Sequence, residues 1–200
     1  VGLIVYNRAI KPNNPELVGA RRRKITTLLY SEAIGRLTQN YKTIAVAGAH
    51  GKSTTTALVS LILMKAGLDP TVIVGTNLRE FSSGLLRHPA SRNGSYGVNF
   101  RAGESEYLVL EADEFGRSFL NYFPTIAVVT NIDLEHLDTY KNIRDVKEAF
   151  LKFLFNTREG GAMILNRDSL LLFSLQARIR KIARRKNLKI YWYSLSRHSH

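Results

Sequence analysis

One segment, residues 43–66, constrains the fold of this 200-residue chain more than any other. The apolar run Thr43–Ala47 is followed by a glycine-rich loop, GAHGKSTTT, in which a helical pattern over Lys52–Ala66 begins. Glycines allow backbone N–H groups to approach phosphate oxygens, and the N-terminus of a helix adds its positive dipole. A strand, a tight glycine loop and a helix in this order therefore predict a phosphate-binding βα unit.

Two side chains in this loop have the chemistry that a nucleotide site needs. Lys52 would neutralise the β- and γ-phosphates, and the Ser53 hydroxyl would bind magnesium. The common pattern G-x-x-x-x-G-K-[ST] has its first glycine where this chain has Val46, so the loop, which begins at Gly48, is two residues shorter. A glycine-rich turn that contains Lys-Ser by chance is the alternative, and the flanking strand and helix favour phosphate binding.

Short β-rich runs alternate with helical patterns along the whole chain. The runs are continuous in apolar residues, as in strands buried on both faces of a parallel sheet. We therefore predict an α/β fold, with a parallel sheet and helices on both faces. The expected strands are LIVY, TIAVAG, PTVIVG, YLVLEAD, TIAVVTN, AMILN and KIYWYSL, and the expected helices are Pro15–Arg23, Lys52–Ala66, Ile143–Thr157 and Asp168–Lys186. The stretch 80–103 is expected to be a functional loop or to hold short strands.

The N-terminal part of the chain differs from the rest. Two short strand–helix pairs, LIVY with NPELVGARRRK and TTLLY with SEAIGRLTQ, have no phosphate motif and too few residues for a core. We predict that residues 1–41 are the C-terminal part of a Rossmann-like domain. Residues 42–200 would be most of a second domain, which holds the phosphate loop.

Acidic residues follow the apolar run YLVLE. Glu111 and Asp113 are two residues apart, so on the period of a strand they point to the same side. The carboxyl end of a parallel strand beside a phosphate loop is a common place for magnesium. The two residues therefore predict a metal site, with a cluster of surface acids as the alternative.

A histidine lies at the end of the next apolar run, TIAVVTN, among the acidic residues of NIDLEHLD. Acids orient a histidine, which can then bind a metal through its neutral imidazole, although an isolated histidine is more often structural. This residue, His136, follows a strand end as the other two motifs do. Three strand ends therefore bring lysine, hydroxyl, carboxylate and imidazole groups to one edge of the sheet.

Charge and composition exclude several classes of protein. The chain has no cysteine, which excludes a disulfide scaffold, a thiolate zinc site and a cysteine nucleophile. It has no long apolar stretch and no secretory signal, so we expect a cytoplasmic protein without a membrane segment. The net charge of +13 keeps a nucleic-acid-binding module open. A solvated helix face explains the basic run 178–197 better, because apolar residues recur at helical spacing between Leu171 and Ile182.

Three motifs in order, GAHGKSTTT, EADEFGRSFL and TNIDLEHLDTY, resemble the ATP-binding central domain of the Mur ligase family, and YNRAIKPNNPEL resembles the end of its UDP-binding first domain. In this family ATP phosphorylates a carboxylate, an amino group attacks the acyl phosphate, and phosphate leaves. The resemblance implies a ligase of peptidoglycan synthesis that uses ATP and Mg²⁺ and joins L-alanine to UDP-N-acetylmuramate. The murein-tripeptide recycling ligase and folylpolyglutamate synthase are alternatives within the family.

The resemblance also implies residue roles. Three residues would be catalytic: Lys52, Glu111 and His136. Magnesium would be held by Ser53, Glu111 and His136. The ATP contacts would come from Gly48, Ala49, His50, Gly51, Lys52, Ser53 and Thr54. Asn99 and Arg101 would lie near the muramyl substrate.

Some features depart from the family's pattern. Gly116 stands where relatives usually carry Asp, and Lys147, a candidate for the carbamylated lysine of several relatives, is interpreted as an ordinary helix-face residue. The family's third domain and most of its first are missing, so we expect a piece of a longer enzyme that is inactive alone. A GTPase stays an alternative, because residues 113–116 fit D-x-x-G, although residues 130–133 lack the lysine of N-K-x-D.

Overall fold

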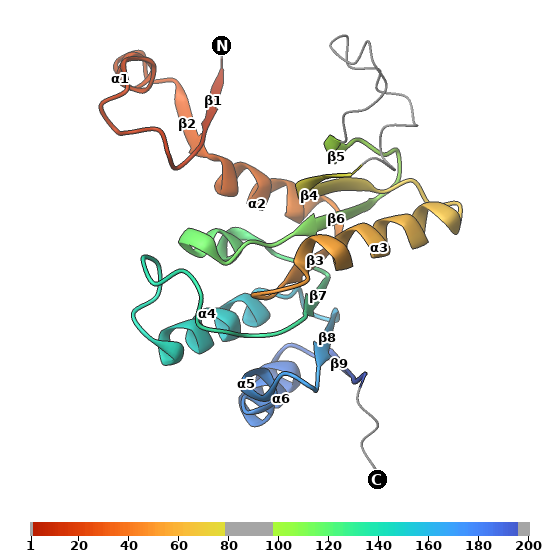
Figure 1. The fold of residues 1–200 in the computed structure, drawn as a ribbon. Helices are drawn as coiled ribbons and strands as arrows, with labels where there is room; N and C mark the ends of the chain where they lie inside the picture. The colour runs from red at the N-terminus through yellow and green to blue at the C-terminus, as the bar shows by residue number, and fades with distance from the viewer. Residues whose placement is uncertain (1, 79–97, 196–200) are drawn as a thin grey trace.

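The computed structural model describes residues 2–78 and 98–195 (Figure 1). In these residues seven strands form one sheet, in which every neighbouring pair is parallel except the edge pair β5–β4. In spatial order the strands are β5 (Val98–Arg101), β4 (Thr71–Leu78), β6 (Tyr107–Glu111), β3 (Lys42–Ala47), β7 (Ile126–Val129), β8 (Ala162–Asn166) and β9 (Lys189–Tyr193). The predicted α/β fold is confirmed, and the antiparallel β5 departs from a wholly parallel sheet.

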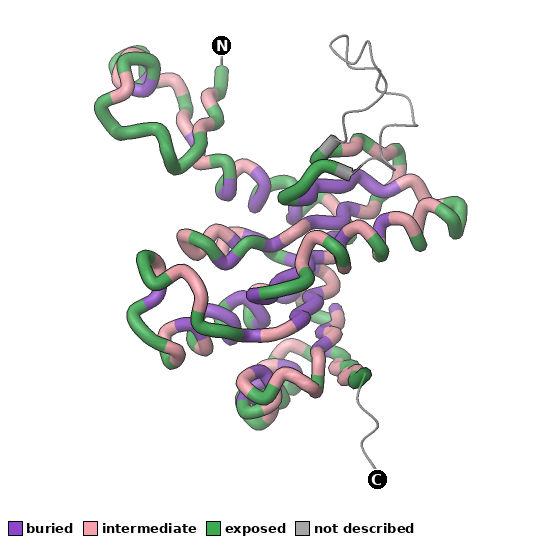
Figure 2. Tube along the Cα trace, viewed as in Figure 1, coloured by how far each residue is buried: buried purple, intermediate pink, exposed green. Residues whose placement is uncertain are grey.

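Helices cover both faces of this sheet, as the sequence predicts. Side chains of β6 alternate between two apolar cores, because Leu108 and Leu110 lie in the larger core and Val109 in the smaller one. α3 (Lys52–Lys65) packs on the smaller core. The larger core is covered by α2 (Tyr30–Asn40), the 3₁₀ helix η2 (Phe115–Asn121), α4 (Ile143–Phe155), α5 (Leu170–Phe173) and α6 (Gln176–Arg185). Figure 2 shows the buried residues concentrated in the strands between these layers.

The first forty residues form a smaller unit. β1 (Leu3–Tyr6) and β2 (Thr26–Leu29) pair in parallel and are connected by α1 (Pro15–Arg22). Figure 1 shows this pair standing apart from the large sheet, with α2 running from it toward β3. Ile34 of α2 lies in the larger core, so α2 joins the two units. The division of the chain near residue 41 stays a prediction.

Two predicted segments differ in the structure. The helix expected over 168–186 is divided into α5 and α6. At the break, the Ser174 hydroxyl donates to the Leu171 carbonyl (2.7 Å). The Leu175 N–H donates to the Leu172 carbonyl, three residues back rather than the four of an α-helix. Of the stretch 80–103, residues 98–101 form β5, and residues 79–97 lie outside the described residues. In the described ranges no helix is long and apolar enough to cross a membrane.

Candidate functional site

The loop between β3 and α3 has the backbone of a phosphate-binding loop. Gly51 adopts the left-handed conformation (φ +78°) as the N-cap of α3. Gly48 has φ +145°, and a Cβ there would collide with Thr130 Oγ1, so only glycine fits. The predicted nucleotide-binding residues 48–54 therefore form one tight turn and the first residues of a 14-residue helix. The N-terminus of that helix lies at the carboxyl edge of the sheet.

Residues that follow β7 hold this loop in place. Asn131 Oδ1 accepts a hydrogen bond from the His50 N–H (2.8 Å), and Asn131 Nδ2 donates one to the His50 carbonyl (2.9 Å). The Thr130 hydroxyl donates to the same carbonyl at 2.6 Å. The backbone of His50 is thus the point at which the loop is fixed. In the sequence, the only sign of this contact is the polar pair Thr-Asn at a strand end, and sequence reasoning gave the pair no role.

The Lys52 side chain folds back and binds the backbone of its own loop. Its Nζ donates to the Gly48 carbonyl at 2.7 Å and to the Ala49 carbonyl at 3.1 Å. The same ammonium forms an ion pair with Glu114, at 2.9 Å from Oε2 and 3.1 Å from Oε1. The Lys52 side chain is 13% exposed and that of Glu114 only 3%. Three acceptors, two backbone carbonyls and one carboxylate, therefore fix the ammonium over the loop.

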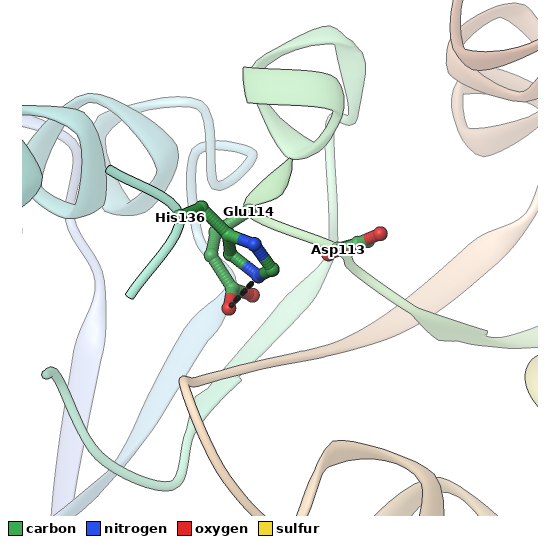
Figure 3. A group of neighbouring side chains, drawn as sticks. All are labelled: Asp113, Glu114 and His136. Carbon is green, nitrogen blue, oxygen red and sulfur yellow. Dashed lines mark ion pairs between the residues drawn. The ribbon is translucent and has the colours of Figure 1, made fainter. Parts of the chain in front are cut away.

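Glu114 links the loop to His136, and sequence reasoning missed this role. His136 Nε2 lies 3.5 Å from Glu114 Oε1, and the Tyr140 hydroxyl donates to the Glu114 carbonyl at 2.7 Å. Burial raises the pKa of the Glu114 carboxyl, and the neighbouring Lys52 opposes this shift. Figure 3 shows the His136 ring over the Glu114 carboxylate, with Asp113 next to them in the chain. These three side chains bring potential ligand atoms within 4.8 Å of one another, close enough to share a metal ion.

Glu111 and Ser53 come together as the sequence predicts for two ligands of one magnesium ion. The Ser53 hydroxyl donates to Glu111 Oε1 at 3.0 Å. The N–H of Gly75, in β4, donates to Glu111 Oε2 at 2.7 Å, and a Cβ at Gly75 would be 3.0 Å from Oε1. β6 pairs with β3 through Val46 and Glu111, which explains why this carboxylate reaches the loop. His136 is grouped with Glu114 rather than with Glu111.

The two predicted substrate residues lie in different surroundings. Asn99 lines a cavity of about 610 Å³ that Glu111 and Asp113 also line. Arg101 instead donates to the Pro70 carbonyl (2.9 Å) and pairs with Asp69. The structure therefore places Asn99, but not Arg101, on the wall of this cavity. The cavity extends from the carboxylates to residues of β1 and of the β2–α2 junction, and so lies between the two units of the chain.

The donor set suits both a polyphosphate and a hard cation. Backbone amides at the N-terminus of α3 and one lysine are the groups that bind phosphate oxygens. Serine hydroxyl and carboxylate oxygens are the ligands that magnesium prefers. With three strand ends meeting at this edge, the fold and loop define a parallel α/β domain with a glycine-rich loop of phosphate-binding type.

Comparison with known proteins places the chain more closely. Residues 46–200 match the Mur ligase middle domain, and the chain belongs to the Mur ligase family. It is 46% identical over 169 residues to the UDP-N-acetylmuramate–L-alanine ligase of Desulforapulum autotrophicum. These aligned residues are 84% of this chain and 34% of that protein. The enzyme of the same name from Aquifex aeolicus is 42% identical, over 83% of this chain and 33% of that protein. The chain thus spans about a third of the length of these curated relatives.

Solved structures agree with this placement. The crystal structure of UDP-N-acetylmuramate-alanine ligase from Thermotoga maritima matches with a TM-score of 0.68 and 27% identity, over 87% of this chain and 37% of that chain. A ligase for UDP-N-acetylmuramate and L-alanyl-γ-D-glutamyl-meso-diaminopimelate from Neisseria meningitides gives a TM-score of 0.71 at 18% identity, over 96% of this chain and 58% of that chain. The second likeness concerns the fold alone. Family membership favours a ligase over the GTPase and nucleic-acid alternatives.

Proposed function

We propose that this chain carries the ATP-binding site of an enzyme that joins L-alanine to UDP-N-acetylmuramate through an acyl phosphate, in peptidoglycan synthesis. The observation that carries the proposal is the contact between Ser53 and Glu111 (3.0 Å) beside Lys52 at the N-terminus of α3. The chain is also 46% and 42% identical to two enzymes of this name. ATP and Mg²⁺ are the proposed cofactors, and the cytoplasm is the proposed location. Residues 1–41 would end the UDP-binding domain, and residues 42–200 would be most of the ATP-binding domain.

The phosphate loop would bind the triphosphate of ATP. The amides of residues 48–54 would donate to phosphate oxygens, and Lys52 would contact the transferred phosphoryl group. Its present partners are the Gly48 and Ala49 carbonyls and the Glu114 carboxylate. Binding therefore requires the ammonium to exchange at least one of these acceptors for a phosphate oxygen. The buried Glu114 carboxylate beside it holds the ammonium over the loop, close to where the phosphoryl group would lie.

Ser53 and Glu111 would hold one magnesium ion, since their oxygens already lie 3.0 Å apart. His136 would bind a second ion, and the neighbouring Glu114 and Asp113 extend its donor set beyond the residues predicted from the sequence. Bound cations screen the repulsion between a carboxylate and a triphosphate, which must meet for acyl phosphate formation. Residues of this chain would position the two substrates. The loop would orient the phosphates of ATP, and Asn99 contributes to the cavity wall along which the muramyl group would lie.

Substrate-dependent phosphate release tests this proposal. We would use the product of the complete reading frame that encodes this chain, hereafter the full-length protein. Release from Mg-ATP is followed with UDP-N-acetylmuramate together with L-alanine, L-serine, glycine or a murein tripeptide. We expect release only when the sugar nucleotide and L-alanine are both present. Dependence on the tripeptide would instead assign the protein to murein recycling, and release without any sugar nucleotide would contradict the proposal.

A further inference from the structure

Arg8, a residue of the N-terminal unit, lies on the wall of the cavity. It follows β1, and with its neighbour Asn7 it lines the same 610 Å³ cavity as Glu111 and Asp113. Among the described residues that line this cavity, Arg8 is the only one with a basic side chain. An anion that enters the cavity meets two carboxylates, and a guanidinium on the same cavity wall would offset that repulsion.

The guanidinium of Arg8 is seated against Gly116 of η2. A Cβ at position 116 would be 2.9 Å from both Cζ and Nη1 of Arg8, so any side chain there would displace the guanidinium. Gly116 has φ +56°, a left-handed conformation that also favours glycine. The missing side chain at position 116 therefore creates the space that the Arg8 head group occupies.

Arg8 has no partner for its charge among the described residues. Within residues 2–78 and 98–195 its guanidinium forms no ion pair and no hydrogen bond, whereas the acids of the site have their own partners. Glu111 is bound by Ser53 and Gly75, Glu114 by Lys52, and Asp113 Oδ1 accepts from the Phe115 N–H. A guanidinium that makes no hydrogen bond within the described part of the chain, and that lies beside a glycine on a cavity wall, is suited to bind a carboxylate or a phosphate.

We propose that Arg8 binds an anionic group of the sugar-nucleotide substrate in this cavity. The inference rests on the proposed function, which supplies a substrate with two such groups, a diphosphate and a carboxylate. Arg8 would thus be a substrate-binding residue contributed by the N-terminal unit. Gly116 would be a positioning residue that keeps the guanidinium in place.

Direct binding and steady-state kinetics of the full-length protein test this role. Arg8→Ala should weaken UDP-N-acetylmuramate binding, measured by calorimetry without ATP, by about 10- to 100-fold, the scale of a hydrogen-bonded charge. The KM for the sugar nucleotide should rise in parallel, while the KM for ATP stays unchanged. Arg8→Lys should recover part of the affinity, because it keeps the charge but not the planar fork. Arg36→Ala is the matched control, since Arg36 is an exposed arginine of α2 that does not line the cavity.

Two more ligands identify which anionic group Arg8 binds. UDP-N-acetylglucosamine has the diphosphate but lacks the lactyl carboxylate. If Arg8→Ala weakens both sugar nucleotides equally, the diphosphate is the bound group. If it weakens only the muramate, the carboxylate is bound. Both outcomes support the role of Arg8.

A double-mutant cycle tests Gly116. Gly116→Ala should weaken UDP-N-acetylmuramate binding in the wild-type protein and have little further effect in the Arg8→Ala variant. Any effect of backbone strain at position 116 occurs in both proteins and cancels in the comparison, which leaves the part that acts through Arg8. Equal effects in the two backgrounds would overturn the positioning role. Wild-type affinity in Arg8→Ala would overturn the proposal for Arg8 alone. A wild-type protein that binds no UDP-N-acetylmuramate would overturn this proposal together with the proposed function.

Discussion

The phosphate loop and the N-terminal unit differ in how their charges are paired. Around the phosphate loop, Lys52, Glu111 and Glu114 are all engaged with protein partners, and of these three Glu111 also lines the cavity. In the N-terminal unit, Arg8 lines the cavity, is exposed and has no partner among the described residues. We expect the charges around the loop to exchange partners when a ligand binds, whereas Arg8 can bind a ligand without giving up a partner among the described residues. Substitutions around the loop should therefore affect stability and catalysis, and substitution of Arg8 should affect binding alone.

The largest effect is expected at Lys52. In the full-length protein, Lys52→Ala should reduce turnover by about 10³-fold or more, because charges that contact a transferring phosphoryl group act on this scale. The measurement is phosphate release at saturating ATP, sugar nucleotide and L-alanine. Lys65→Ala, at the exposed end of the same helix, is the control and should keep full activity. Turnover at the wild-type level in Lys52→Ala would refute the role of the loop.

Substitutions of Glu114 and Arg8 should differ most clearly in their effect on the free energy of unfolding. Glu114→Ala leaves a nearly buried Lys52 without its carboxylate, which should cost about 3–5 kcal/mol. Arg8→Ala removes an exposed group and should change stability by less than about 0.5 kcal/mol. Thermal melting of the two variants beside the wild-type protein measures the difference. Similar melting temperatures for both variants would contradict the contrast between the phosphate loop and the N-terminal unit.

Glu111 should control the response to magnesium. Glu111→Gln keeps the shape but halves the oxygen donors, so the Mg²⁺ concentration for half-maximal activity should rise about 10- to 100-fold. A Mg²⁺ titration at fixed ATP measures this, and His136→Ala should shift it in the same direction. Glu106→Gln serves as the control, because Glu106 is a surface residue paired with Lys42. An unchanged titration for Glu111→Gln would contradict its assignment as a ligand.

The smallest effect is expected at Asn131. Asn131→Ala removes two hydrogen bonds to the His50 backbone and should loosen the loop. The KM for ATP should rise about three- to ten-fold, in line with one or two modest hydrogen bonds. Asn40→Ala, at the exposed end of α2, controls for a general effect of losing an asparagine. A KM change equal to that of the control would show that the loop holds its shape without Asn131.

The sequence was sufficient for features that depend on local pattern. Apolar runs predicted the strands of the described residues except β5, and the order of strand, glycine loop and helix predicted the tight turn before α3. The contact between Ser53 and Glu111 also followed, because the ends of neighbouring parallel strands meet at one edge. These features need only the periods of strands and helices and the direction of the sheet.

Contacts between distant parts of the chain could not be predicted from local sequence patterns. The pairing of Lys52 with Glu114 depends on how the residues after β6 turn back toward the loop. The contact of Arg8 with Gly116 depends on where the N-terminal unit packs, and no pattern within either segment encodes that position. The break between α5 and α6 was missed because the apolar spacing of residues 171–182 continues across it.

The proposed function requires that the site transfers a phosphoryl group from ATP to a substrate carboxylate. The most direct test uses UDP-N-acetylmuramate labelled with ¹⁸O in its carboxylate, together with ATP, Mg²⁺, L-alanine and the full-length protein. A carboxylate oxygen that attacks the γ-phosphorus stays with the phosphoryl group when the amine displaces phosphate. We expect one ¹⁸O atom in each phosphate released by the wild-type protein. Released phosphate that carries no ¹⁸O would contradict it.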